Sequence, residues 1–212
     1  PTLSVAALAL DPANANRLYA VTASDGVYRT TNGGTSWNQI SADNLEAVVH
    51  GGKLIVSPAN PNLLLLASKA GVRRSTDGGV TWPVALAGGT ATGLVVDPTN
   101  PNRLYAALYH ETNNGVAGTY ISPDGGATWR KLQGCPGAGL PATTAKVRIT
   151  LAMSGSKLFT GYRSASQFQL FRTTNQTCTV NTPAGAQTEP RWEAGWQTST
   201  DHGVLWSGLY AD

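Results

Sequence analysis

A polar phrase with two adjacent glycines recurs three times in this chain and constrains the fold more than any other feature. It is TTNGGTSW at 30–37, STDGGVTW at 75–82 and SPDGGATW at 122–129, so the copies begin 45 and 47 residues apart. Short acceptors such as Asp77 can bond the N–H groups of a turn, and paired glycines accept the positive φ of a tight hairpin. The tryptophan that follows is large enough to fill the space beneath the turn.

A second phrase precedes each polar turn and completes the repeat. It begins at Asp11, Ser57 and Asp97, and its proline ends a strand because proline cannot donate a hydrogen bond. Each unit then contains four short strands, which the first unit shows as SVAALAL, RLYAVTA, GVYRT and SWNQI. A period of this length indicates a repeat architecture.

A four-stranded unit cannot bury both of its faces alone, and radial stacking of such units solves the problem. The sequence therefore predicts an all-β fold, a β-propeller with blades of four antiparallel strands. The 212 residues supply about four and a half blades at this period. We expect one propeller region over 1–212, with units at 1–43, 44–88, 89–135 and 140–182 and a partial or irregular fifth unit at 183–212.

The fourth unit has a degraded turn. Asn175 stands where Asp77 stands in the second unit, and Gln176 and Thr177 replace the glycines, so we expect a turn of different shape. Beyond it, STDHGVLW at 199–206 fits the turn spacing, but HGVLWSGLYAD can instead open a further unit. We interpret the chain as a fragment of a longer one, because it lacks an initiator Met and ends within the pattern. The alternative is a ring that a completing chain or a homo-oligomer closes.

Composition narrows the class of protein. Charged residues are 13% of the chain and hydrophobic residues 41%, which favours an extracytoplasmic β protein (secreted, periplasmic or at the cell surface). The net charge is +3 and the cations are scattered, so we expect no nucleic-acid partner, and no apolar run is long enough for a membrane span. Cys135 and Cys178 can form a disulfide between neighbouring units, or they are two unrelated buried thiols.

The turn motif Ser/Thr-x-Asp/Asn-x-Gly-x-x-Trp resembles the Asp-box, or bacterial neuraminidase repeat. Propellers with this repeat occur in secreted glycoside hydrolases, sortilin-type receptors and photosystem II assembly-type proteins. The resemblance covers roughly residues 1–180 and implies that the motif is a folding device away from the ligand-binding face. The structural residues that it implies are Thr30, Asn32, Gly34, Trp37, Ser75, Asp77, Gly79, Trp82, Ser122, Asp124, Gly126 and Trp129.

The resemblance also implies what an enzyme of this kind would need. Family sialidases carry an arginine cluster announced by a Phe/Tyr-Arg-Ile-Pro phrase, which this sequence lacks. Xyloglucan-hydrolysing propellers use two Asp as acid and base. The candidate carboxylates outside the turns are Asp25, Asp43, Glu46, Glu111, Glu189, Glu193 and Asp201. Asp25 stands out because the equivalent loop KAGVRR has no acid, but an ordinary turn residue explains it as well, and no catalytic residue is assigned.

Basic and metal-ligating residues give weaker signals. Arg29, Arg73 and Arg172 fall on third strands, where we expect solvated outer positions, whereas Arg148 lies on a channel-side strand and is a candidate pocket residue. The three histidines, His50, His110 and His202, occupy unrelated places in the repeat. We therefore expect neither a metal site nor a cofactor.

Aromatic residues outside the turns are the candidate binding residues. Tyr109 and His110 precede the insertion ETNNGVAG at 111–118, and Trp192 and Trp196 flank the irregular tail. They suit sugar or protein recognition, and packing between blades is the alternative. The leading hypothesis is an exported, non-catalytic propeller segment that serves as a binding or assembly scaffold for carbohydrate or protein. The alternatives are part of a secreted glycoside hydrolase, xyloglucanase-like or sialidase-like, and a structural subunit that partner chains complete.

Overall fold

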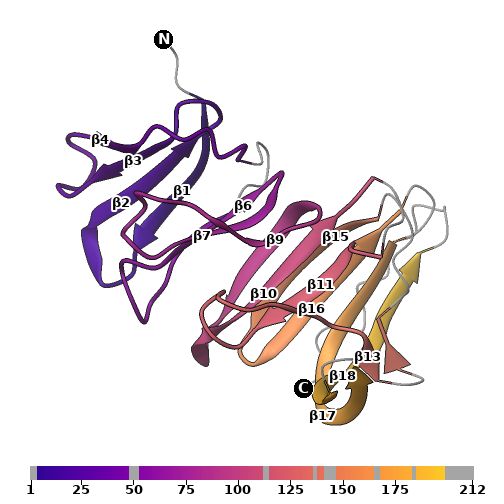
Figure 1. Cartoon of the computed structure of the whole chain (residues 1–212). Helices are drawn as coiled ribbons and strands as arrows, with labels where there is room; N and C mark the ends of the chain where they lie inside the picture. The colour runs from indigo at the N-terminus through magenta and orange to yellow at the C-terminus, as the bar shows by residue number, and fades with distance from the viewer. Residues whose placement is uncertain are drawn as a thin grey trace.

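The chain forms a row of four-stranded antiparallel sheets, as the computed structural model shows (Figure 1). The structure describes residues 4–47, 53–111, 115–135, 138–140, 147–164, 168–182 and 185–198. All regular structure within these ranges is β-strand. The prediction of an all-β propeller fold is confirmed, and the four sheets are its blades.

Each blade is a meander in which consecutive strands pair. Blade 1 contains β1 (Val5–Asp11), β2 (Asn14–Thr22), β3 (Val27–Thr30) and β4 (Asn38–Ser41). Blade 2 contains β5 (Leu54–Val56), β6 (Leu64–Ser68), β7 (Gly71–Ser75) and β8 (Val84–Leu86). Blade 3 contains β9 (Thr90–Asp97), β10 (Asn100–Tyr109), β11 (Gly118–Ser122) and β12 (Arg130–Lys131). Blade 4 contains β15 (Arg148–Ser154), β16 (Lys157–Arg163), β17 (Phe168–Thr182) and β18 (Gly185–Thr198), and a short hairpin of β13 (Gly134–Cys135) and β14 (Ala138–Gly139) precedes it.

The core lies between the blades rather than inside any one of them. Alternating side chains of a strand point to opposite faces of its sheet, so each blade offers one apolar face to each neighbour. Three buried clusters result, one at each junction, and they centre on Tyr19 with Leu64, on Leu65 with Leu104, and on Tyr105 with Ile149. The first strands of neighbouring blades adjoin, β1 with β5 and β9 with β15.

The bounds of the fourth blade differ from those predicted from the sequence. Residues 185–198, expected as an irregular excursion, form β18 and pair with β17, so this blade continues to Thr198 rather than ending at 182. The degraded turn is absent, because β17 runs from Phe168 to Thr182 with only a register shift between Thr173 and Thr177. Without the two glycines the backbone has no inexpensive route into positive φ, and the strand continues instead.

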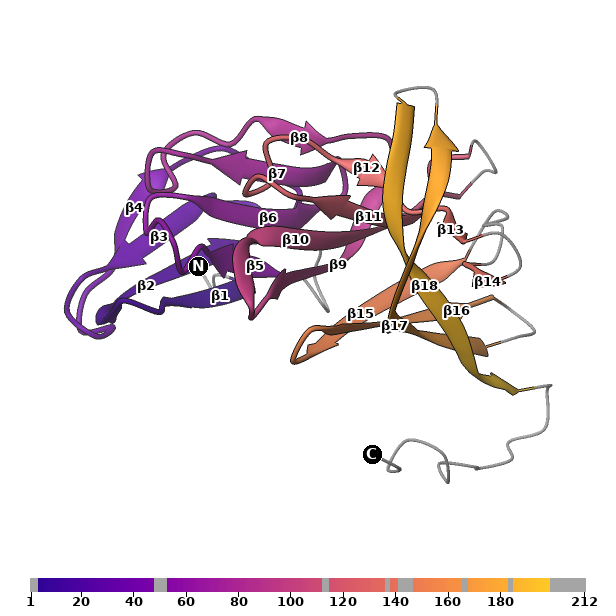
Figure 2. The ribbon, with the colours of Figure 1, turned by 90° about the horizontal axis from the view of Figure 1, so that it is seen from below.

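Two opposite ends of the blades carry different connections (Figure 2). In a meander, the first-to-second and third-to-fourth hairpins lie at one end, which we name the turn face because it holds the three polar turns. The second-to-third hairpins and the segments that lead into the next blade lie at the other end, which we name the crossover face. The long β17–β18 hairpin projects well beyond the other strands in Figure 2.

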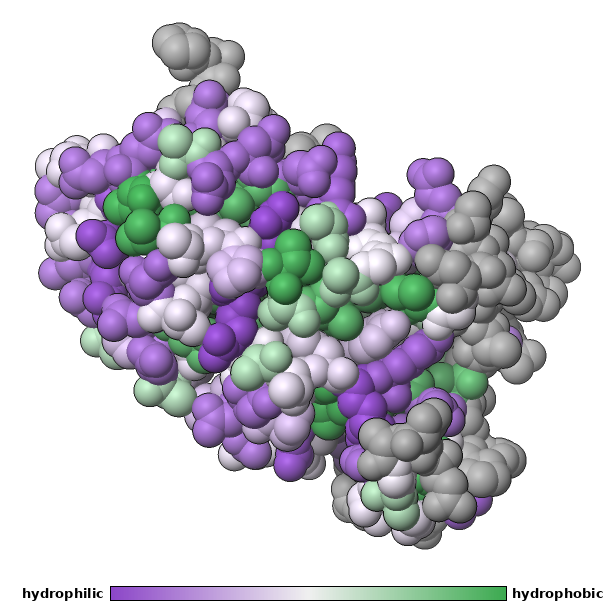
Figure 3. Space-filling model, viewed as in Figure 1, coloured by the Kyte–Doolittle hydropathy of each residue, from purple (hydrophilic) through white to green (hydrophobic). Residues whose placement is uncertain are grey.

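Hydrophobic surface remains exposed on the first blade (Figure 3). Val5, Leu8 and Leu10 on β1 are each more than half exposed, at 56%, 59% and 53%. No helix long and apolar enough to cross a membrane occurs in the described ranges.

Candidate functional site

The three polar turns are closed by their own side chains. In the second turn, the Ser75 hydroxyl donates to Asp77 and accepts from the Gly79 N–H at 2.9 Å, while Asp77 Oδ1 accepts from the Val80 and Thr81 N–H groups. The Trp82 indole donates to the Gly79 carbonyl at 2.8 Å. The turn at 30–37 repeats these bonds with the Thr30 hydroxyl and the Asn32 carboxamide. The turn at 122–129 repeats them with the Ser122 hydroxyl and the Asp124 carboxylate. The Ser or Thr hydroxyl and the Asp or Asn side chain of the motif are therefore engaged within each turn.

The carboxylates of the turn face are all held in local bonds. Asp11 pairs with Arg17, and Asp97 accepts from the Thr99 N–H at 2.8 Å and from Arg103 at 3.2 Å. Burial alone would raise the pKa of Asp77, but hydrogen bonds from Thr81, Ser75 and Val80 outweigh it and lower the pKa to about 2. Similar bonds lower the pKa of Asp11, Asp97 and Asp124 against the effect of burial. These acids are fixed as structural anions.

The crossover face carries a different set of carboxylates. Asp25 lies in the β2–β3 loop, Asp43 and Glu46 lie between blades 1 and 2, and Glu111 follows β10; all four are exposed. Glu46 has a positive φ of 50° although it is not a glycine, and its carbonyl accepts from the Lys69 N–H at 3.0 Å. Such a backbone conformation is costly for a residue with a side chain and often occurs near functional sites. The exposed acids of blades 1 to 3 that lie outside the polar turns thus share one face.

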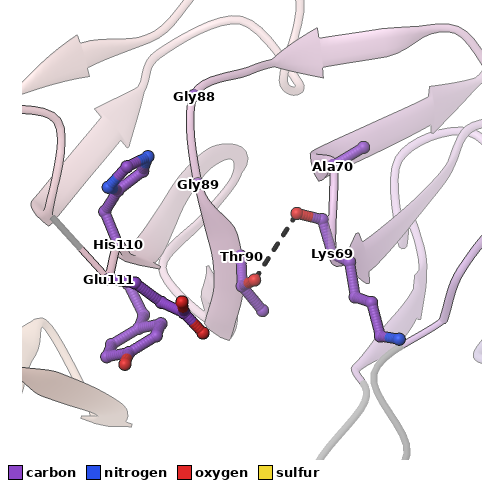
Figure 4. Close-up of a pocket in the computed structure, with 8 residues that line it drawn as sticks. Lys69, Ala70, Gly88, Gly89, Thr90, His110 and Glu111 are labelled. Atoms are coloured by element: carbon purple, nitrogen blue, oxygen red, sulfur yellow. Dashed lines mark hydrogen bonds between the residues drawn. The ribbon is translucent and has the colours of Figure 1, made fainter. Parts of the chain in front are cut away.

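A pocket of about 620 Å³ opens on this face at the junction of blades 2 and 3 (Figure 4). Three segments line it: the β6–β7 turn, the connection from blade 2 to blade 3, and the end of β10. Its lining residues are Lys69, Ala70, Gly88, Gly89, Thr90, Tyr109, His110 and Glu111. Figure 4 shows Glu111 and Thr90 in the middle of the view, with His110 on one side and Lys69 on the other.

Glycine shapes the wall of this pocket. A Cβ on Gly89 would lie 2.5 Å from the Tyr109 carbonyl oxygen, so only glycine permits the two backbones to approach so closely. Gly88 has φ +107°, and a Cβ there would lie 2.7 Å from Val116 of the 111–118 insertion. The insertion is held in turn by Lys131, whose ammonium donates to the Gly115 carbonyl at 2.7 Å. The pocket is therefore built from the blade junction and the inserted loop together.

The lining mixes an aromatic ring with groups of every hydrogen-bonding type. Tyr109 and Ala70 offer apolar surface, Lys69 donates, the Glu111 carboxylate accepts, and Thr90 and His110 can do both. The Thr90 hydroxyl donates to the Lys69 carbonyl at 3.5 Å. Such a lining suits a polyhydroxylated ligand, which has both apolar C–H faces and hydroxyl groups. Among the described lining residues Glu111 is the one carboxylate, so the pocket does not assemble a facing pair of acids.

The structure separates the predicted binding residues. Tyr109 and His110 line the pocket, whereas Arg148 is exposed at the start of β15 and lies outside it. Trp192 is only 2% exposed and packs between blades 3 and 4, which is the alternative of packing between blades that the sequence left open. It lies opposite Thr173 and fills its junction as Trp82 and Trp129 fill theirs. The Trp196 side chain lies outside the described part.

Two further predictions changed at the blade junctions. Arg29, Arg73 and Arg172 are half-buried rather than solvated, and Arg73 donates to the Trp82 carbonyl at 3.0 Å. Glu189, a candidate acid from the sequence, is fully buried and pairs with Arg130. Its second oxygen accepts from the Gln133 and Gly134 N–H groups at 2.9 and 2.6 Å, so it fastens β18 to the segment after blade 3.

For several candidate residues the structure describes either nothing or the backbone alone. They are His50, Glu193, Asp201 and His202, together with residues 112–114 of the insertion. Cys178 of β17 is disulfide-bonded, and the chain's other cysteine, Cys135, belongs to β13 beside β17 and β18. Their pairing stays a prediction. Among the described residues, no group of three or more His, Cys, Asp and Glu side chains could hold a metal ion.

Known proteins with similar sequence or structure include glycoside hydrolases. A xyloglucanase of Hypocrea jecorina (strain QM6a) is 26% identical over 175 residues, which cover 64% of this chain and 21% of that protein. The crystal structure of a GH74 enzyme of Niastella koreensis superimposes with a TM-score of 0.61 at 20% identity, covering 88% of this chain and 30% of that one. A GH74 xyloglucanase from Xanthomonas campestris gives 0.58 at 23% identity, with the same coverage of 88% and 30%.

The similarity concerns a part of those proteins. No family model matches the sequence. The chain spans about a fifth of the length of the curated relative and about three tenths of the two solved structures. It has a β-propeller fold similar to that of glycoside hydrolase propellers.

Proposed function

We propose that this chain is a carbohydrate-binding segment of an Asp-box propeller of the glycoside hydrolase type, and that it binds a β-glucan such as xyloglucan on its crossover face. The pocket between blades 2 and 3 carries the proposal, because it joins an aromatic ring, an acid and a cation on the face that the polar turns do not occupy. The sequence similarity to a xyloglucanase supports this class of ligand. An extracytoplasmic location follows from such a substrate and from the low content of charged residues.

The geometry favours binding as the activity of this segment. A sugar ring can stack its C–H face on Tyr109, while Glu111 and Lys69 exchange hydrogen bonds with its hydroxyl groups. The polar turns serve stability in this proposal, since the Asp77 and Asp124 carboxylates already accept from backbone N–H groups and a hydroxyl of the same turn. This is the role that the Asp-box resemblance implies for them.

Affinity electrophoresis in gels containing xyloglucan tests the proposal, with an unbranched β-glucan and a mannan as comparison polysaccharides. Xyloglucan should retard the protein, and Glu111→Gln should lower the affinity about tenfold, as the replacement of a hydrogen bond to a charged acceptor by one to a neutral acceptor predicts. Asp43→Asn is the matched control, because it also neutralises an exposed acid of the crossover face but lies outside the pocket. Equal mobility in all gels would refute the proposal, as would equal losses in the two variants.

Hydrolysis of the same polysaccharide is the second candidate, and the gathering of acids on the crossover face favours it. A glycosidase needs two carboxyl groups about 5–9.5 Å apart across the scissile bond. Asp25 is the acid of blade 1 that the repeat does not demand, and it is exposed on the crossover face, with its side chain accepting from Ser24 at 3.0 Å. Release of new reducing ends from xyloglucan that Asp25→Asn abolishes would support hydrolysis, and binding without any release would exclude it for this segment.

A further inference from the structure

The exposed face of blade 1 matches the faces that are buried at the other blade junctions. In blade 1, Leu10 pairs with Leu18 and Leu8 with Ala20. The same register places Val56 with Leu64 and Leu54 with Leu66 in blade 2, and Val96 with Leu104 and Leu94 with Ala106 in blade 3. We name this side of each blade its front face and the opposite side its back face.

Burial separates blade 1 from its equivalents. Leu8 and Leu10 are 59% and 53% exposed, whereas Leu54 and Val56 are 8% and 5% exposed because the back of blade 1 covers them. Trp37 is 38% exposed, but the equivalent Trp82 is 4% exposed. The front of blade 1 is thus a complete blade-packing surface that nothing in the described structure covers. A contiguous apolar patch of this kind marks an interaction site.

The chain also carries a surface with the pattern of a covering face. The back of blade 1 presents Tyr19, which pairs with Ala9 on one side and with Arg29 on the other. On the back of blade 4, Phe159 pairs with Ala152 and with Arg172 in the same arrangement. Ala152 is exposed and Phe159 is half-buried. Blade 4 therefore repeats the aromatic, the small residue and the arginine that blade 1 turns towards blade 2.

The polar turns show how such a junction closes. A Cβ placed on Gly79 would lie 3.7 Å from the ring of Tyr19, and one on Gly126 would lie 2.4 Å from Leu65, so the preceding blade packs directly on the second glycine. Arg74 of blade 2 also donates to the Gly125 carbonyl of the next turn at 2.9 Å. At the equivalent position of Gly34 in blade 1, Trp37 of the same turn is the one described residue within 4 Å. Gly34 therefore leaves room for an aromatic side chain from a preceding blade.

We propose that the front of blade 1 binds the back of blade 4 in a second copy of this chain, so that two copies join head to tail and close a ring. In this dimer Phe159 of the second copy packs against Gly34, and Leu8, Leu10 and Trp37 become buried as their equivalents are. Each contact is heterologous, because the front face of one copy meets the back face of the other. The ring closes when the two contacts form together. The inference does not depend on the carbohydrate ligand.

The mass of the whole chain in solution, by light scattering after size-exclusion chromatography, tests the dimer. The wild type should have twice the chain mass of 22.1 kDa. Leu10→Glu on the front and Ala152→Glu on the back should each give monomers, because each places a charge in both contacts of the ring. Both positions are exposed, so both variants should fold, which circular dichroism checks. Val80→Glu is the matched control, because Val80 is 49% exposed outside both faces, and it should stay dimeric.

Mixing the two monomeric variants tests the head-to-tail arrangement. The intact front of Ala152→Glu should bind the intact back of Leu10→Glu, so a one-to-one mixture should recover a dimer through a single contact. A monomeric wild type at its highest soluble concentration would overturn the proposal. A dimer that resists Leu10→Glu would overturn it too, and so would one that Leu10→Glu breaks but Ala152→Glu does not, since that pattern indicates contact between two fronts.

Discussion

Asp77 and Asn32 occupy the same place in two polar turns, and the contrast between them isolates what the charge contributes. The Asn32 Oδ1 accepts the Ser36 N–H at 3.0 Å much as Asp77 Oδ1 accepts the Thr81 N–H at 3.0 Å. Geometry alone therefore suffices to close the turn. The carboxylate adds a dependence on pH, because only Asp77 can take up a proton.

Asp77→Asn should lower stability at pH 7 and should reduce its loss in acid. The folded-state pKa of about 2 lies below the ordinary 3.8, so the carboxylate stabilises the fold fully above about pH 4 and loses this effect as the pH falls towards 2. Melting temperatures from pH 7 to pH 2 should therefore converge for the variant and the wild type in acid. Asp77→Ala should cost roughly 1–3 kcal/mol at pH 7, because turn amides lose their acceptor. A parallel acid dependence in Asp77→Asn and wild type would contradict the assignment.

The paired glycines link a turn to the blade before it. Gly126 and Gly155 both have positive φ, at 81° and 54°, but a Cβ on Gly126 meets Leu65 at 2.4 Å whereas one on Gly155 meets nothing within 4 Å. An alanine at either position bears roughly 1–2 kcal/mol of backbone strain. Gly126→Ala should therefore lower the free energy of unfolding more than Gly155→Ala in a urea titration. Equal losses would show that the turn alone demands the glycine.

Glu189 makes β18 part of the blade stack. Its buried carboxylate holds Arg130 and two N–H groups after blade 3, so Glu189→Ala leaves a cation and two amides without their acceptor. Breaking a buried pair in this way costs roughly 3–5 kcal/mol. Hydrogen exchange of Glu189→Ala, measured by mass spectrometry, should be accelerated relative to the wild type. The acceleration should be larger in β18 and at 130–134 than in β2 and β3. Uniform protection across all four blades would contradict this anchoring role.

The sequence predicted the parts of the fold that depend on local chemistry. The three turns and the strand order follow from residues within one repeat, such as Ser75, Asp77 and Gly79, and the structure contains them. The sequence did not identify the partners of Trp192 and Glu189, because these lie far along the chain, at Thr173 and Arg130. Tyr109 and His110 were found as an insertion, but the pocket itself needed Lys69 and Gly89 from elsewhere in the chain. Contacts between blades leave no short-range pattern to detect.

The described acids of blades 1 to 3 are divided between the two ends of the blades. The turn face holds its carboxylates in bonds that stabilise each blade, whereas the pocket and the exposed acids outside the polar turns lie on the crossover face. A ligand that binds as proposed should therefore perturb one end of the blades only. Because every blade has both ends, the turn face serves as an internal control for binding at the crossover face.

Titration of the 15N-labelled protein with xyloglucan oligosaccharides, followed through backbone amide shifts, tests this central claim most directly. We predict shifts at the pocket amides of Lys69, Gly88, Gly89 and Thr90, with the amides of Gly34, Gly79 and Gly126 in the polar turns unchanged. Shifts centred on the polar turns, or a spectrum that saturating oligosaccharide leaves unaltered, would contradict the assignment of carbohydrate binding to the crossover face.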